Sequence, residues 1–213
     1  MSIGALRPGA RALDIGGGRG DHGAVWAARG VQAIVLDASM RMAADASRQE
    51  GVAAIVGRSE ALPFRPGAFD LAYFHLSIHY GDWRAALAEA ARVTAPGGRI
   101  DVWTLGPRHH RQSHLARWFP RVRELDEARF PNPDDLAAFG ETVGRVEARE
   151  EWTERVTREA ADWADAVRAG FVSTLQLLTG QEVEDGLTRF AIHHPPGSVL
   201  HYELLFDRVV VLT

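Results

Sequence analysis

A glycine-rich segment, LDIGGGRG at residues 13–20, combines an acidic side chain with alternating glycines. Asp14 precedes Gly16, Gly18 and Gly20, and a helix is expected to follow them. Glycine lacks a Cβ, so the backbone can turn sharply and approach a ligand closely. The following helix would offer free N–H groups to an anionic end of that ligand. Three alternating glycines are more than a plain turn requires, so we interpret the segment as a ligand-binding loop.

A second acidic side chain, Asp37, ends the apolar run VQAIVLD, about 20 residues after the first glycines. A carboxylate at the tip of a second strand can accept hydrogen bonds from both hydroxyls of a ribose. The simpler alternative is a solvated acid at the end of a strand. The glycine loop and Asp37 together favour a cofactor that contains a ribose.

Two classes of cofactor fit these residues. Gly18, Gly20 and Gly23 also spell GxGxxG, the pattern of NAD-type and flavin enzymes. In a dinucleotide site, however, the first glycine directly follows the strand, whereas here Gly16 and Gly17 intervene. The acid inside the motif can instead organise the loop around a cationic amino-acid group. A NAD-type oxidoreductase is therefore the less favoured alternative.

Alternating strands and helices must position these side chains. Residues 11–57 are interpreted as strand, turn, helix, strand, helix and strand. The expected elements after them are a strand at 69–76, a helix at 82–94 capped by Asp82, a stop at APGG, and a strand at 99–105. Strands joined by helices of about ten residues indicate βαβ units. The predicted fold is α/β, with a Rossmann-like, doubly wound, mostly parallel seven-stranded sheet.

Two longer segments follow the fifth strand. Residues 106–131 are basic and aromatic with a helical pattern, and 155–198 are interpreted as two helices broken at TGQE and a loop. GRVEAREEWTERV, between them, alternates as a strand does, and 199–213 is the predicted final strand. We expect a single domain, 1–213, with a cofactor-binding core at 11–105. The helical additions after the fifth and sixth strands are expected to form a substrate lid.

The composition excludes several kinds of chemistry. Cysteine is absent, so thiol nucleophiles, iron–sulfur clusters, cysteine zinc sites and disulfides are impossible. All 24 basic residues are arginine, and the lack of lysine removes Schiff-base chemistry and the Walker lysine. A net charge of −4 disfavours nucleic acid as a partner. No apolar run approaches the ~20 residues of a membrane span, so we expect a cytoplasmic protein without a membrane partner.

Four segments resemble a known family in their order and spacing. They are LDIGGGRG, VLDAS, GRSEALPFRPGAFDLAYFHLSIHY and WRAALAEAARVTAPGGRIDV. Together they are similar to class I S-adenosylmethionine (SAM)-dependent methyltransferases, in the small-molecule branch that includes the ubiquinone and menaquinone biosynthesis enzymes. The resemblance covers residues 11–104 and implies SAM as cofactor and a small-molecule methyl acceptor.

The resemblance also implies a role for individual residues. The methionine part of SAM would lie along Asp14, Gly16 and Gly18, with Gly20 in the same loop. Asp37 would hold the ribose, and Ser39 or Met40 would flank the adenine. The adenine-side loop would contain Ser59 and Glu60, and His75 would lie near the sulfonium. Two positions depart from the family pattern. Gly17 stands where a cysteine is usual, and Arg58 stands where an acid often accepts a hydrogen bond from the adenine amine.

Histidines are numerous, with nine in the chain. His75 and His79 lie at the end of the fourth predicted strand, and His109, His110 and His114 cluster after the fifth. A histidine near a substrate hydroxyl could remove its proton during methyl transfer, because its pKa lies near neutrality. His79 is the first choice for this base and His75 the second. No carboxylates stand at ligand spacing beside the histidine cluster, so no metal site is expected.

Three hypotheses about function follow. The favoured one is methyl transfer from SAM to a small, partly apolar molecule by in-line displacement, with a possible histidine base. The alternative is an accessory or sensor protein that binds SAM or a nucleoside without methyl transfer. The weakest is another SAM-assisted reaction on the same fold, because fold does not fix function. The sequence indicates neither the acceptor atom nor the oligomeric state.

Overall fold

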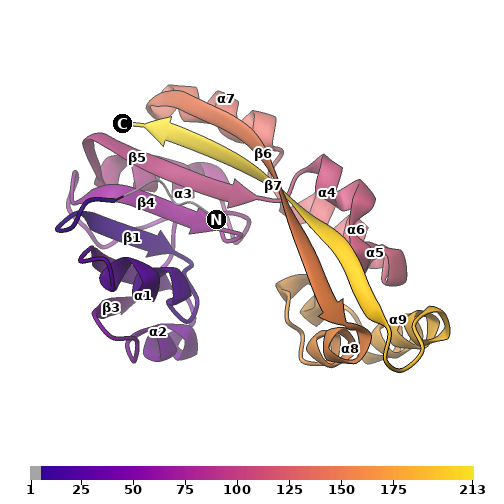
Figure 1. The fold of residues 1–213 in the computed structure, drawn as a ribbon. Helices are drawn as coiled ribbons and strands as arrows, with labels where there is room; N and C mark the ends of the chain where they lie inside the picture. The colour runs from indigo at the N-terminus through magenta and orange to yellow at the C-terminus, as the bar shows by residue number, and fades with distance from the viewer. Residues whose placement is uncertain (1–5) are drawn as a thin grey trace. The chain divides into compact units, whose positions relative to one another are not determined.

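A computed structural model describes residues 6–213 and contains one seven-stranded sheet in the order β3-β2-β1-β4-β5-β7-β6 (Figure 1). The strands are β1 Arg11–Ile15, β2 Gln32–Asp37, β3 Val52–Val56, β4 Phe69–His75, β5 Thr94–Thr104, β6 Arg145–Glu159 and β7 Val199–Leu212. The helices are α1 Asp21–Ala27, α2 Met40–Ala46, α3 Trp83–Val93, α4 Pro107–Gln112, α5 His114–Trp118, α6 Pro120–Arg129, α7 Pro133–Val143, α8 Ala160–Arg168 and α9 Gly180–His193, with a 3₁₀ helix η1 at Ser173–Leu177.

The pairing of the strands confirms the predicted α/β fold. Strand β1 pairs in parallel with β2 and β4, β2 with β3, and β4 with β5, whereas β7 runs antiparallel to β5. The carboxyl ends of β1, β2 and β4 therefore meet at one edge of the sheet. Asp14, Asp37 and His75 all lie within the last two residues of these strands.

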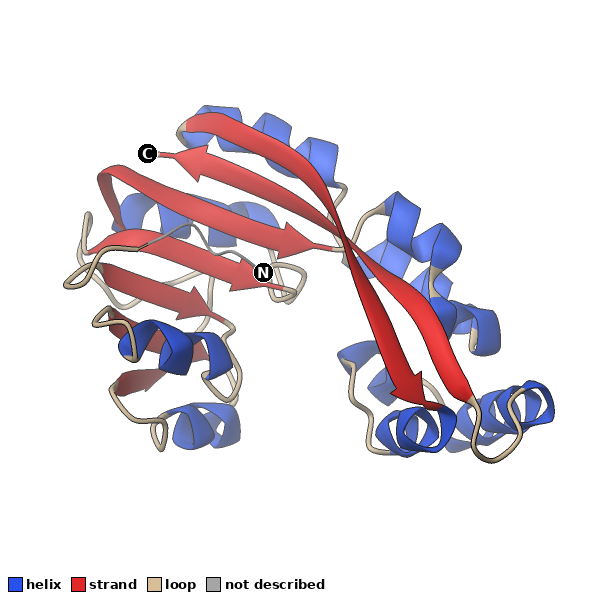
Figure 2. Ribbon diagram, in the orientation of Figure 1, coloured by secondary structure: helices blue, strands red, loops and turns tan. Residues whose placement is uncertain are grey.

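Helices cover both faces of the parallel strands, as Figure 2 shows. The side chains of β4 alternate between the two layers, because successive residues of a strand point to opposite faces. The Tyr73 ring packs on Trp26 of α1, with 5.3 Å between ring centroids. Phe74 instead joins a core cluster that contains Leu87 and Ala90 of α3. Each large side chain buried in this way contributes about 1.5–3 kcal/mol to stability.

Helix α3 begins as predicted, but the segment after it differs. The Asp82 side chain caps α3, because its Oδ1 accepts hydrogen bonds from the N–H groups of Arg84 (2.9 Å) and Ala85 (3.2 Å). Strand β5 starts at Thr94 rather than near residue 99. The pairing register between β4 and β5 shifts at this point, so APGG forms an irregularity inside the strand. Helix α3 ends at Val93, before these glycines, and Gly97, with a φ of 78°, permits the irregularity in the strand.

The chain divides into two compact units. The first contains the described residues up to Thr104, together with 131–150 and 207–213. The second contains 105–130 and 151–206. The second unit has its own apolar core, which includes Trp118, Phe119, Trp163 and Phe190. The helical additions predicted at 106–131 and 155–198 lie almost wholly in this unit, which also contains parts of β6 and β7. Their role as a substrate lid stays a prediction.

The helices of the second unit are more broken than the sequence pattern indicates. The basic stretch after β5 forms three short helices, because Ser113 caps α5 and Pro120 starts α6. The predicted break at TGQE starts α9 and lies well after the end of α8. There Thr179 and Glu182 form a reciprocal capping box, a motif that fixes the first turn of a helix.

Candidate functional site

The glycine loop between β1 and α1 has a backbone that only glycine adopts easily. Gly16 and Gly18 have φ angles of 70° and 57°, in the left-handed region that is costly for residues with a Cβ. Gly16 also has no room for a side chain, because a Cβ there would lie 2.6 Å from the Cβ of Ser77. The loop is tied to β2, since the Gly16 N–H donates to the Leu36 carbonyl at 2.7 Å.

Asp37 ties this loop to the start of α2. Its Oδ2 accepts a hydrogen bond from the Gly18 N–H at 3.0 Å, and its Oδ1 accepts one from the Ser39 N–H at 2.8 Å. A carboxylate has about four acceptor positions, so further hydrogen bonds from ligand hydroxyls can be accommodated. The Ser39 Oγ accepts from the Met42 N–H at 3.3 Å and so caps α2. Met40 is 76% exposed beside it.

Asp14 is a buried acid without a neutralising partner. It is 1% exposed, and neither carboxylate oxygen has a hydrogen-bond partner within residues 6–213. Burial, with smaller contributions from the charges of Asp37 and Asp21, raises its pKa to about 7. The Asp14 side chain lies directly under Gly17, where a Cβ would come within 2.4 Å of its Cγ. A cationic group within hydrogen-bond distance of these oxygens would supply a partner, which is the chemistry that the ammonium of a bound amino acid offers.

The loop after β3 forms a small polar cluster. Arg58 Nη2 donates to Glu60 Oε1 at 2.9 Å, and Ser59 Oγ donates to Glu60 Oε2 at 3.1 Å. Glu60 also lies against the loop after β4, because a Cβ on Gly81 would be 2.1 Å from Oε1. Arg58 is therefore engaged with the acid two residues away.

The turn after β4 is strained and tied to the glycine loop. Leu76 has a φ of 52°, which is rare for a residue with a Cβ. Ser77 Oγ donates to the Ile15 carbonyl at 2.5 Å, so the two loops are held together. His79 follows in this turn, 7% exposed, with its ring centroid 4.2 Å from that of Tyr80. Strain of this kind is concentrated at functional sites.

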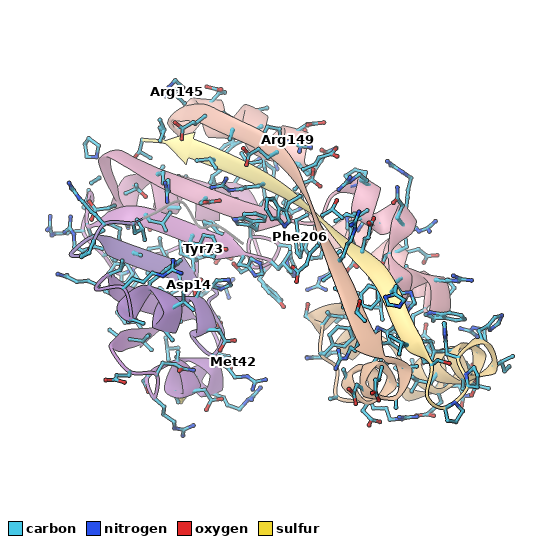
Figure 3. The ribbon with its side chains drawn as sticks, in the orientation of Figure 1. Asp14, Met42, Tyr73, Arg145, Arg149 and Phe206 are labelled. Carbon is cyan, nitrogen blue, oxygen red and sulfur yellow. The ribbon has the colours of Figure 1, made fainter. Side chains whose placement is uncertain are left out.

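A second histidine lies beside His75, and sequence reasoning missed it. The His22 ring, on the first turn of α1, is 4.7 Å from that of His75 and 5.2 Å from that of Tyr73, measured between centroids. Asp14 and Tyr73 occupy paired positions on β1 and β4, which places this group beside the buried acid (Figure 3). Burial lowers the pKa of His22, and it lowers the pKa of His75 to about 4, with a further contribution from His22. His75 is therefore neutral at neutral pH, and burial favours the neutral form of His22 as well.

The remaining predicted histidines lie in the second unit. His109 Nδ1 accepts a hydrogen bond from the Leu205 N–H at 3.3 Å, so this side chain is part of the packing between α4 and β7. His110 is 4% exposed, and His114 stacks on Tyr202 with 4.7 Å between ring centroids. Within residues 6–213, no three histidine or acidic side chains come together in a way that could hold a metal ion. No helix in that range is long and apolar enough to cross a membrane.

Comparisons with known proteins identify this arrangement. Residues 13–101 match the family model described as a methyltransferase domain. The chain is 38% identical over 171 residues to a demethylmenaquinone methyltransferase of Corynebacterium efficiens, an alignment that covers 75% of this chain and 70% of that protein. It spans about two fifths of the length of other curated relatives that it matches.

Two solved structures share the fold. A protein from an antibiotic biosynthesis pathway of Anabaena variabilis superposes with a TM-score of 0.77 at 22% identity, covering 98% of this chain and 92% of that one. Geranyl diphosphate C-methyltransferase of Streptomyces coelicolor, solved with S-adenosylhomocysteine (SAH), gives 0.62 at 18% identity, covering 98% and 74%. The NAD-type alternative is set aside, because the matched family and the first relative are methyltransferases. The chain belongs to the class I SAM-dependent methyltransferases, in the branch related to the menaquinone and ubiquinone methyltransferases.

Proposed function

We propose that the chain transfers a methyl group from SAM to a small-molecule acceptor and that the loops after β1, β2 and β4 form the cofactor site. The observation that carries this proposal is the buried, unpartnered Asp14 beneath a left-handed glycine loop. An uncompensated acid in the interior is costly, so proteins keep one where a ligand compensates it. The cationic methionine end of SAM fits that requirement.

Two carboxylates are proposed to bind different parts of SAM. Asp14 would face the cationic amino-acid end of SAM, and Asp37 would accept the hydroxyl hydrogen bonds of the ribose. Asp37 is well placed for this role because its existing bonds to the N–H groups of Gly18 and Ser39 fix its orientation. Met40, exposed beside Ser39, offers an apolar surface for the adenine. Ser59 and Glu60 are proposed for the other side of the adenine.

The bound cofactor supplies an activated methyl group, so the chain's residues chiefly align the acceptor and exclude water. Alignment of this kind can lower the activation free energy by about 7–11 kcal/mol. A base is most effective when its pKa lies near the working pH. His75, with a pKa of about 4, is poorly suited to that task. We assign the base to His79, the other histidine at the carboxyl end of β4, and the positioning of the cofactor's reactive end to His75 and His22.

Binding of SAH tests the cofactor site. Asp37→Ala is expected to weaken SAH binding by about 1.5–3 kcal/mol, the range for hydrogen bonds to a charged group. Isothermal titration calorimetry measures the change, and Glu50→Ala, at an exposed acid of the same unit, is the matched control. Unchanged affinity in the Asp37 variant would remove the ribose assignment.

Turnover separates the enzyme from a sensor. Release of SAH from SAM is followed with a panel of small acceptors that begins with demethylmenaquinone, the acceptor named for the Corynebacterium efficiens relative. Methyl transfer to one acceptor supports the enzyme. Tight SAH binding without turnover across a broad panel would favour the accessory or sensor role. His79→Asn is expected to lower kcat by about 10²–10⁴-fold for a hydroxyl acceptor while SAH affinity is retained.

A further inference from the structure

A pocket in the second unit is lined by arginines and lies apart in sequence from the loops of the proposed cofactor site. It has a volume of about 430 Å³ and is formed by α4, α5, α6 and β7. The lining residues that matter here are Arg111, Ser113, His114, Arg117, Arg123 and Tyr202. A pocket of this size accommodates a small organic molecule.

The three arginines of the pocket outnumber the one acid in its lining. Arg111, Arg117 and Arg123 form no ion pair with a carboxylate in the part of the chain that the structure describes. The one acid in the lining, Glu203, is already engaged, because its Oε1 lies 3.5 Å from Nε of Arg155. The chain as a whole is acidic, with a net charge of −4, so a concentration of unpaired arginines is a local feature.

The hydrogen-bond donors of the pocket are partly fixed in place. Arg123 donates to the carbonyls of His110 (3.0 Å) and Arg111 (3.1 Å), which holds its guanidinium at the end of α4. A guanidinium has five N–H donors, so three remain available. Ser113 is buried and uses its Oγ as acceptor for the Ala116 N–H at 3.2 Å. Its hydroxyl hydrogen has no acceptor within residues 6–213.

An aromatic wall completes the pocket. His114 and Tyr202 stack with 4.7 Å between ring centroids and 14° between ring planes. Trp163 meets the His114 ring edge-on at 5.2 Å, so this imidazole is fixed from a second side. The buried Nε2 of His114 has no hydrogen-bond partner among the described residues. A ligand with a flat or apolar body could therefore rest against rigid side chains.

We propose that this pocket binds the phosphate group of a small organic phosphate ester. A carboxylate is satisfied by one bidentate arginine, whereas a phosphate carries up to two charges and more acceptor oxygens. Three arginines and a serine hydroxyl exceed what one carboxylate needs. The volume beyond the phosphate leaves room for an organic body against the aromatic wall. This inference does not depend on the proposed methyl transfer.

Calorimetry with inorganic phosphate, on the full chain at constant ionic strength, tests the pocket. The double variant Arg111→Gln/Arg117→Gln is expected to bind phosphate about tenfold more weakly, or worse. The matched control, Arg29→Gln/Arg145→Gln, removes two exposed arginine charges of the first unit and is expected to bind as the wild type does. An equal loss in both double variants, or no saturable binding to the wild type, would overturn the proposal. So would malonate binding as tightly as phosphate.

Two further measurements locate the phosphate site and separate it from the cofactor site. Amide chemical-shift changes in the wild type upon phosphate addition should concentrate at residues 111–117 and 202–205, and changes elsewhere instead would overturn the site. This mapping needs no variant, so it stands even if the double variant folds poorly. SAH affinity should be equal in all these proteins. Absence of SAH binding by the wild type would refute the proposed function and leave the phosphate pocket standing.

Discussion

Replacing Asp14 by asparagine should stabilise the protein and weaken its cofactor binding at the same time. The carboxyl is 1% exposed and has no hydrogen-bond partner among the described residues. Burial is the main reason that its pKa is raised from an ordinary 3.8 to about 7. Asparagine has nearly the same shape and carries no charge. Asp14→Asn therefore removes the cost of an interior anion without opening a cavity.

The pKa shift gives the size and the sign of the effect. Between pH 4 and 7 the folded protein holds a proton on Asp14 that the unfolded chain has lost, so the free energy of unfolding falls as pH rises. Below about pH 4 both states hold the proton, and above about pH 7 neither does. With about 1.4 kcal/mol for each pKa unit, the destabilisation reaches about 4 kcal/mol above pH 7 and is about 1.5 kcal/mol at pH 5. The stability gained by Asp14→Asn should thus grow by roughly 2.5 kcal/mol from pH 5 to pH 8.

Urea unfolding at pH 5 and pH 8, followed by tryptophan fluorescence without ligand, measures this difference. Trp26, which packs on Tyr73 of β4, reports on the unit that contains Asp14. Glu50→Gln, at an exposed acid, is the control and should show the same small effect at both pH values. The unpaired amide of the new asparagine lowers the free energy of unfolding equally at pH 5 and pH 8, so this contribution cancels when the two pH values are compared. The reasoning would be refuted if the stability difference between Asp14→Asn and the wild type were the same at both pH values. It would also be refuted if that difference became less favourable to the variant from pH 5 to pH 8.

The remaining predictions concern packing, ion pairs and capping. Gly17→Ala places a Cβ 2.4 Å from the carboxyl carbon of Asp14. It should lower the free energy of unfolding in urea by about 1–3 kcal/mol and weaken SAH binding in calorimetry. Arg208→Gln removes two hydrogen bonds, at 2.9 and 2.7 Å, from the fully buried Asp101, and should cost about 3–5 kcal/mol. By contrast, Arg168→Gln on an exposed pair of α8 should cost under about 1 kcal/mol, and equal melting-temperature losses in these two variants would contradict the argument. Asp82→Ala removes the cap of α3 and should cost about 1 kcal/mol in thermal unfolding.

Features that depend on neighbouring residues could be predicted from the sequence. The strand, glycine loop and helix at 11–27 follow from local periodicity and glycine chemistry, and the parallel sheet then brings the ends of β1 and β2 together. The capping role of Asp82 is equally local. The placement of Asp37 near the glycine loop needed only one further assumption, that β1 and β2 are adjacent, and their paired register confirms it.

Features that depend on register or on distant contacts could not be predicted. His22 and His75 are far apart in sequence, and only the packing of α1 against β4 brings their rings within 4.7 Å. The bulge in β5 arises from pairing with β4, which a glycine stop signal does not reveal. The cap at Ser113 has a local signal, a serine before a helical pattern, but basic residues on both sides continue the same pattern.

The departures from ordinary folding rules gather in one part of the first unit. An unpartnered acid at Asp14, a left-handed backbone at Leu76 and neutral histidines at His22 and His75 all lie at the carboxyl ends of β1 and β4 or at the start of α1. The buried acid and the left-handed Leu76 lower stability, while the buried strands around them are apolar and tightly packed. A chain under selection for stability alone would lose these features, so their coincidence needs a compensating gain. Cofactor binding supplies that gain most directly at Asp14, because an opposite charge there cancels the largest of these costs.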